Sequence, residues 1–318
     1  MSRVKPRTAI HIQSHKSPGQ VLRLIDRIRR SSDGETIVLV SHQVGGEPLT
    51  LADITAGGEG VLLPSSGGYG DFTHVDRYLE SVAWLVDHDD PFDWFVNISG
   101  QDYPVRPLRV MEQELAQGGD DAWLGFFDAF GPASKWPLAR AHTRYEFRHR
   151  RIRNLSDRSQ RALRPASAAL NLAQPWVRVS PAFGAVGVRR RSLFTDEFRC
   201  YAGSFWGATS REAAAYVLEH SRSRPDVVDY FRTTLAPDEV YVQTVLGNAP
   251  GFSIRPEARR YFDFSTSRGT NHPKTLGIAD LPAMTASPAW FARKFDAAVD
   301  GLVLDELDRA NGWGQGTD

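Results

Sequence analysis

The chain has 318 residues, of which 41% are hydrophobic and 24% are charged, and its formal net charge is zero. This length favours one large α/β domain or two small ones, and it buries a core that needs no disulfide or structural metal. The balanced charge argues against bulk electrostatic binding to nucleic acid or to an anionic membrane.

Targeting and redox features are sparse. The single cysteine, Cys200, excludes an internal disulfide and a cysteine zinc site, so we expect a buried structural thiol. The basic residues 1–8 lead into an apolar run too short for a signal peptide. The longest strongly apolar run, residues 37–40, is far below the ~20 residues of a membrane-spanning helix. The sequence therefore predicts a cytoplasmic protein without a transmembrane segment.

The chain begins with the pattern of a βαβ unit. We expect a strand over residues 8–14, followed by a helix with Ser17 as its N-cap and Pro18 at its first position. Apolar residues recur at helical spacing up to Ile28. Residues 36–40 are continuously apolar, which is typical of a strand in a sheet that is covered on both faces.

Strands and helices continue to alternate after this unit. The pattern predicts strands over residues 61–63, 94–98 and 122–127 and helices over residues 71–87 and 111–116. Polar residues and a glycine, Ser99 to Pro104, follow the strand at 94–98. In open α/β sheets, residues that bind ligands gather at the carboxyl ends of the strands. We therefore expect this loop to face a ligand.

The periodicity fails between residues 128 and 180, and this segment is strongly basic. From Lys135 to Arg164 there are ten Lys and Arg residues against only Glu146 and Asp157. We predict an irregular, inserted segment on the substrate side of the domain, with some helix. The run of charge is either a solvated surface or one lip of a cleft that meets an anionic or polyhydroxy ligand.

The remaining elements complete a single domain that spans residues 1–318. We expect strands over residues 183–188, 199–208 and 260–264, a helix capped by Ser210, a helix opened by residues 236–239 and a final helix over residues 296–311. There is no internal repeat and no long linker. The sequence leaves the oligomeric state open.

Common nucleotide-binding and metal-binding motifs are absent or badly placed. No G-x-G-x-x-G follows the first strand, and no G-x-x-x-x-G-K-[ST] occurs, which argues against dinucleotide-binding and P-loop proteins. The one D-x-D triplet, residues 87–89, lies where a helix is predicted to end. We interpret it as a solvated helix end and not as a metal site.

Seven short segments point to a known family. They are residues 12–16 (IQSHK), 69–72 (YGDF), 94–104 (WFVNISGQDYP), 202–212 (AGSFWGATSRE), 236–239 (APDE), 272–274 (HPK) and 291–296 (FARKFD). Together, and in this order, they resemble the family of core-2/I-branching N-acetylglucosaminyltransferases and peptide O-xylosyltransferases. The resemblance implies a GT-A-like fold and inverting transfer of N-acetylglucosamine or xylose from a UDP-sugar to a hydroxyl, giving a β-glycoside.

The resemblance also implies that no metal or other cofactor is required. Lys274 and Lys294 match the basic residues with which the family holds the pyrophosphate. Departing UDP leaves negative phosphates that a cation must stabilise, so the chemistry suits these positions.

Glu239 matches the catalytic base of the family. In an inverting transfer, a positioned carboxylate takes the proton of the attacking hydroxyl. An acidic residue in the first turn of a helix after a proline is also common without catalysis, because it complements the helix dipole. We expect Asp238, beside it, to cap the helix.

Other positions are carried over to the donor side. Tyr69 either stacks on uracil or packs in its turn, and Asp102 either binds the donor sugar or braces its loop. His15 belongs to the first of the seven segments. His42 stands about where family members often have an acidic residue against the nucleoside.

The acceptor side is defined less sharply. Arg144 and Tyr145 resemble a basic–aromatic acceptor element. Trp206 lines the acceptor cleft or belongs to the core, and Phe264 stands where the family usually has tryptophan. The sequence does not identify the acceptor; we expect a glycan, a lipid-linked glycan or a small molecule, and no nucleic acid. A metal-dependent transferase of another family and a non-catalytic nucleotide-sugar-binding protein remain as alternatives.

Overall fold

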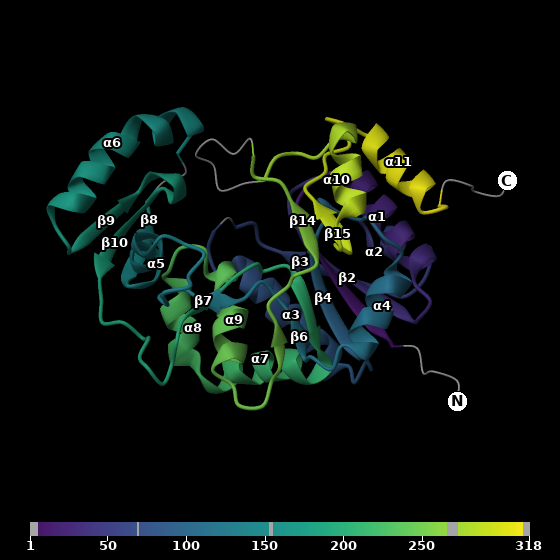
Figure 1. Ribbon diagram of the computed structural model, residues 1–318, viewed down its shortest axis with the longest axis horizontal. Helices are drawn as coiled ribbons and strands as arrows, with labels where there is room; N and C mark the ends of the chain where they lie inside the picture. The colour runs from purple at the N-terminus through teal and green to yellow at the C-terminus, as the bar shows by residue number, and fades with distance from the viewer. Residues whose placement is uncertain (1–5, 69, 153–154, 266–272, 314–318) are drawn as a thin grey trace.

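The computed structural model describes residues 6–68, 70–152, 155–265 and 273–313. At its centre is a seven-stranded sheet in the order β13-β6-β12-β4-β1-β2-β3, with helices on both faces (Figure 1). The strands are β1 (Thr8–Ser14), β2 (Thr36–Gln43), β3 (Gly60–Ser65), β4 (Trp94–Ser99), β6 (Ala122–Trp123), β12 (Gly207–Ser210) and β13 (Ile254–Arg255).

Most neighbouring strands of this sheet run parallel. β1 pairs in parallel with both β2 and β4, and β2 pairs in parallel with β3. β12 is antiparallel to its neighbours β4 and β6, and β13 is again parallel to β6. The predicted α/β class, with a mainly parallel central sheet flanked by helices, is confirmed.

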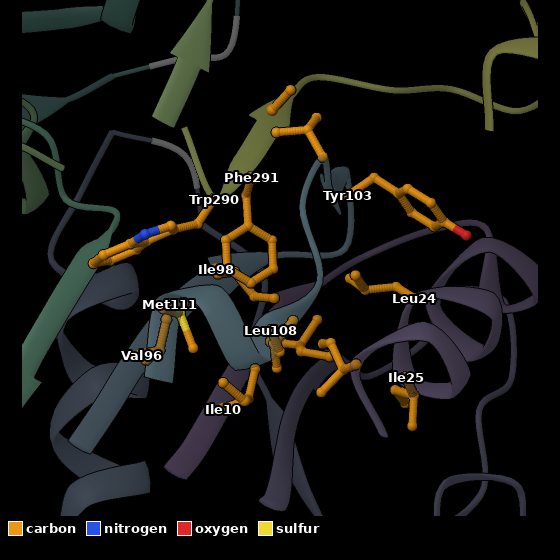
Figure 2. Close-up of a cluster of buried hydrophobic side chains, with 14 of the residues drawn as sticks. Ile10, Leu24, Ile25, Val96, Ile98, Tyr103, Leu108, Met111, Trp290 and Phe291 are labelled. Carbon is orange, nitrogen blue, oxygen red and sulfur yellow. The ribbon is translucent and has the colours of Figure 1, made fainter. Parts of the chain in front are cut away.

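The central strands are buried on both faces, as their continuous apolar runs predict. Along β1, Ile10 and Ile12 point into one hydrophobic cluster and Ala9 points into the other. Figure 2 shows the first cluster, where Ile10 and Ile98 of the sheet lie below Phe291. Helices α1 (Pro18–Ser31), α4 (Leu108–Gln117), α10 (Leu281–Ala286) and α11 (Leu302–Ala310) supply this cluster. Helices α3 (Thr73–Asp87), α7 (Arg211–Ser223), α8 (Pro225–Arg232) and α9 (Tyr241–Gly247) supply the other.

Small sheets extend the central one. β15 pairs in parallel with β14 and antiparallel with β5, and β11 pairs antiparallel with β7. Their bounds are β5 (Asp102–Pro104), β7 (Phe127–Asp128), β11 (Tyr201–Ala202), β14 (Arg260–Phe262) and β15 (Phe291–Arg293). A short helix, α2 (Leu51–Thr55), precedes β3. As expected, Cys200 is buried.

The segment expected to be irregular is mostly regular structure. It contains α5 (Leu138–Tyr145), β8 (Phe147–Arg151), α6 (Asp157–Ala173) and β9 (Val177–Ser180), and β10 (Ala185–Arg189) follows. β10 pairs antiparallel with both β8 and β9, and α6 lies along the outside of this small sheet at the edge of the molecule (Figure 1). The prediction of irregularity was therefore wrong. Arginines and exposed leucines interrupt the apolar periodicity by which a helix or strand is recognised.

The starts of several helices differ from the prediction. Ser17 has left-handed backbone angles (φ 54°) and makes no side-chain cap, whereas Ser210 accepts a hydrogen bond from the backbone N of Ala213, as predicted. Residues 237–239 form a 3₁₀ turn ahead of α9, and Asp238 makes no capping hydrogen bond, so its predicted cap is wrong. The final helix starts at Leu302, six residues later than predicted. None of the described helices combines the length and apolar character that crossing a bilayer demands.

Candidate active site

A cleft of about 1480 Å³ opens at the carboxyl edge of the central sheet. Its lining includes Ser14 and His15 at the end of β1, Gln43 at the end of β2 and Gly100 after β4. These strands are parallel, so their carboxyl ends meet at this edge. The loop from Ser99 to Pro104 was predicted to face a ligand, and its first three residues line the cleft.

The opposite wall comes from segments distant in sequence. Trp136, Arg140, Arg144 and Arg151 line it from the basic segment, and the 3₁₀ turn contributes Glu239. The interpretation of the basic run as one lip of a cleft agrees with this arrangement.

The cleft is rich in positive charge. Its lining holds seven Lys and Arg side chains but only three carboxylates, those of Asp71, Asp238 and Glu239. Within the described part of the chain, Lys294 and Arg140 form no ion pair. Burial, and then the charges of Arg293 and Lys16, lowers the pKa of Lys294. This balance favours an anionic ligand.

Glu239 is held in place from two sides. Nη1 of Arg144 donates a hydrogen bond to Oε2 of Glu239, and the backbone N of Gly203 donates to the carbonyl oxygen of Glu239 (2.8 Å). The Arg144 guanidinium lies over the rings of Trp136 (5.1 Å) and Phe183 (5.8 Å). The Glu239 side chain remains 35% exposed, so it is fixed and still accessible from the cleft.

Asp238 is a second, differently placed carboxylate. Its Oδ1 is buried and has no hydrogen-bond donor among the described residues. Burial, and then the neighbouring Glu239 charge, raises the pKa of Asp238 to about 7. Near neutral pH, the turn therefore presents one ion-paired carboxylate beside one that is part-protonated.

Two of the predicted donor residues line the cleft. Lys294 and His15 do so, whereas Nζ of Lys274 contacts Asp263 (3.0 Å) and Asp280 (2.6 Å) outside the lining. Pro273, directly before Lys274, is part of the lining. Tyr69 and His272 lie outside the described residues.

Asp102 and His42 are buried away from the cleft lining. Asp102 accepts a hydrogen bond from the backbone N of Ser99 (2.9 Å) and lies 3.8 Å from Nε of both Arg260 and Arg293. This arrangement favours the bracing alternative for Asp102. The ring of His42 contacts Oγ of Ser14 and the carbonyl oxygen of Glu47, each at 2.7 Å.

Three of the four predicted acceptor residues line the cleft, and one does not. Arg144, Trp206 and Phe264 line the cleft, and Phe264 is 54% exposed. Tyr145 is fully buried and donates a hydrogen bond to the carbonyl oxygen of Ala236 (3.2 Å). It therefore supports the 3₁₀ turn from behind and does not reach the cleft.

Several cleft residues escaped the sequence prediction. Asp71 and Arg293 lie inside the recognised segments 69–72 and 291–296, next to residues that were selected. Nδ1 of His74 donates a hydrogen bond to Oε1 of Gln13 (2.7 Å), and burial, followed by the Arg77 charge, lowers the pKa of His74 to about 4. Arg151 comes from the basic segment. In the sequence, only the positive charge of that segment indicated that Arg151 could belong to the site.

No three His, Cys, Asp or Glu side chains gather closely enough to hold a metal ion in the ranges that the structure describes. Asp87 of the D-x-D triplet is the last residue of α3, is exposed and contacts Arg222 (3.3 Å). The triplet lies outside the cleft lining.

A sequence model of the Core-2/I-Branching enzyme family matches residues 60–285. This match covers most of the chain and includes the 3₁₀ turn with Glu239. It leaves out the first of the seven segments, at 12–16, and the last, with Lys294.

Named relatives match at low identity. Beta-glucuronosyltransferase GlcAT14A of Arabidopsis thaliana is 26% identical over 74% of this chain and 46% of its own length. Xylosyltransferase 1 of Mus musculus is 24% identical over 76% of this chain and 23% of its own length. A probable beta-1,6-N-acetylglucosaminyltransferase of Homo sapiens is 20% identical over 76% of this chain and 52% of its own length. The chain thus spans about half or less of each of these relatives.

A solved structure of glucosyl-3-phosphoglycerate synthase from Mycobacterium tuberculosis, bound to Mn2+, UDP-glucose and phosphoglyceric acid, matches at 18% identity. It covers 74% of this chain and 68% of that chain, with a TM-score of 0.30, which is too low to support a conclusion. The family match and the mainly parallel sheet agree with the GT-A-like α/β fold that the sequence predicted.

Proposed function

Because the chain belongs to the Core-2/I-Branching enzyme family, we propose that it is an inverting glycosyltransferase that moves a sugar from a UDP-sugar to an acceptor hydroxyl. The observation that carries the proposal is one cationic cleft, at the carboxyl edge of the sheet, that contains both Glu239 and Lys294, a lysine without an ion pair to any described residue. A carboxylate to take a proton and a cation to receive a phosphate are the two groups that this transfer needs.

Glu239 is proposed as the base. The acceptor oxygen forms a bond to the anomeric carbon from the face opposite UDP, and its proton passes to Oε of Glu239. The bond from the anomeric carbon to the phosphate oxygen breaks, and its electron pair leaves with UDP. Attack from the opposite face gives the β-glycoside from an α-linked donor.

Lys294 is proposed to stabilise the charge that develops on the departing phosphates. Its half-buried ammonium has no carboxylate partner within the described residues, so a phosphate would not have to displace one. Lys274 remains a second candidate, but a phosphate would have to compete with Asp263 and Asp280 for it. The reaction is proposed to need no metal.

The sugar is proposed to be N-acetylglucosamine or xylose. Relatives named as a xylosyltransferase and a beta-1,6-N-acetylglucosaminyltransferase support these two. The relatives named beta-glucuronosyltransferase add UDP-glucuronic acid as a third donor to test. Release of UDP from each donor, with and without candidate acceptors, separates the three.

Substitution of the proposed base is the direct test. Glu239→Gln should lower kcat by at least about a hundredfold, because general base catalysis contributes on that scale, while UDP binding by calorimetry stays unchanged. Glu219→Gln, an exposed glutamate of α7, serves as the matched control and should retain full activity. Normal turnover of Glu239→Gln would remove Glu239 from this role, and UDP-sugar binding without turnover by the native protein would favour a binding protein.

Metal independence is tested separately. The native protein should show the same rate of UDP release in EDTA as in added Mn2+, because cationic side chains take the place of a metal. Dependence of the rate on added Mn2+ or Mg2+ would contradict this part of the proposal and leave the role of Glu239 intact.

A further inference from the structure

The part of the chain that covers β8 to β10 is far more basic than the rest. We define the basic lobe as residues 147–152 and 155–191, in which ten arginines stand against one acidic residue, Asp157. Five of these arginines are exposed and form no ion pair with any described residue: Arg148, Arg150, Arg158, Arg161 and Arg191. The whole chain has zero net charge, so this charge is concentrated and not general.

Helix α6 of this lobe buries little of its surface, and its leucines stay half exposed although Leu163 and Leu170 lie on the same side of the helix as the buried Ser167. Ser167 is its one buried residue, and Asn171 bonds to β9 through the N (2.9 Å) and O (3.0 Å) of Val179. Leu163 and Leu170 are each 46% exposed. A surface helix of a globular protein normally buries its leucines and exposes its polar side.

More apolar side chains are exposed where α6 ends. Leu172 is 88% exposed, Trp176 68% and Val188 59%. Two hydrogen bonds bring them to one end of the lobe: Nε2 of the Gln174 side chain donates to the carbonyl oxygen of Leu170 (3.2 Å), and the carbonyl oxygen of Trp176 accepts from the backbone N of Arg189 (2.8 Å). We call Leu170, Leu172, Trp176 and Val188 the apolar tip.

We propose that the basic lobe docks on the surface of an anionic lipid bilayer, with the apolar tip in the lipid and the exposed arginines against the headgroups. Amphipathic helices that lie in a membrane interface combine an arginine-rich side with exposed leucine, and tryptophan prefers the same depth. Exposed arginines are attracted by the negative surface potential of such a bilayer.

The exposed apolar side chains separate this partner from other polyanions. A nucleic acid or an acidic polysaccharide would use the arginines, but its phosphates or carboxylates gain little from Leu172 or Val188. A bilayer binds both the arginines and the apolar side chains, since burial of apolar side chains adds to the attraction between charges. The combination therefore favours lipid.

The lobe also lines the cleft, through Arg151 and Phe183. These cleft residues belong to the end of the small sheet where Ala185 pairs with Arg151, whereas the apolar tip belongs to the end where Val188 pairs with Val177. The tip and the cleft therefore lie at opposite ends of this sheet, and docking by the tip does not cover the cleft.

The test is co-sedimentation of the full chain with phosphatidylcholine vesicles, prepared with and without phosphatidylglycerol. We expect binding to the anionic vesicles only, and a loss of that binding at high salt. The double variant Leu172→Ser/Trp176→Ser should bind at least about tenfold more weakly, because both apolar side chains are removed from the interface. Leu302→Ser is the matched control, because Leu302 is 68% exposed on α11, outside the lobe.

Three results would overturn the docking surface: equal binding to both vesicle types, binding by the double variant at native strength, or self-association without lipid that the double variant abolishes. The last would assign the tip to a second copy of the chain. A thermal melt and UDP affinity of each variant show that the fold and cleft are intact. Vesicle binding needs no turnover, so a failure of the transferase function would leave this test readable.

Discussion

At the scale of single residues, the candidate site depends on contacts between positions far apart in sequence. Arg144 and Glu239 are 95 residues apart, yet the guanidinium holds the carboxylate in the cleft. The resemblance selected both residues, but for different roles, with Arg144 on the acceptor side. No local pattern predicts such a pair, because spacing along the chain reports only neighbours on one strand or helix.

Asp238 gives a prediction for stability as a function of pH. Its pKa is about 7 in the folded protein and near 4 when unfolded, so the unfolded carboxyl ionises first as pH rises. Ionisation of Asp238 thus lowers the free energy of unfolding progressively between about pH 4 and pH 7, and its effect is constant above that range. Asp238→Asn should remove this loss and raise the free energy of unfolding above pH 7 by up to about 4 kcal/mol relative to the native chain, because the two pKa values differ by about three units.

Chemical denaturation at pH 4 and at pH 8 measures this effect. The stabilisation by Asp238→Asn should be larger at pH 8 than at pH 4. Asp229→Asn, at an acidic position of α8 outside the cleft lining, is the comparison. An equal effect of Asp238→Asn at both pH values would mean that folding does not raise the pKa of Asp238.

At the scale of helices and strands, prediction succeeded where burial alone decides the pattern. β1 was predicted to the residue, since Thr8–Ser14 is buried throughout and Pro18 starts the next helix. It failed where the backbone follows tertiary contacts. The carbonyl oxygen of Glu239 accepts from Gly203, and the 3₁₀ turn at 237–239 replaces the first turn of the expected helix.

Helix α6 gives a prediction at this scale. The Asn171 side chain donates one hydrogen bond to Val179 and accepts one from it, and both join the helix to β9, so Asn171→Ala should weaken that packing by about 1–2 kcal/mol. Faster hydrogen exchange in α6 and β9, with β1 and β4 unchanged, is the expected result. Gln174→Ala, which breaks contacts at the end of the helix, should disturb less of α6. Uniform faster exchange across the molecule would mean that α6 is not a separate unit of stability.

At the scale of the whole molecule, the cleft is formed by two segments whose sequences do not show that they lie together. The parallel strands supply one wall, as α/β topology predicts, and the basic segment supplies the other. The mainly parallel sheet was predictable because its apolar runs are continuous. The position of the segment opposite the strand ends was not, because nothing in its residues specifies how it folds back.

The concentration of arginine in one lobe of a neutral chain has an electrical consequence. The rest of the protein must carry an equal negative charge, so the molecule has a permanent dipole moment despite its pI of about 7.1. In the field of a negatively charged surface, such a molecule experiences a torque before contact. It would reach the surface with the basic lobe facing it, because its orientation would be set during diffusion and not after contact.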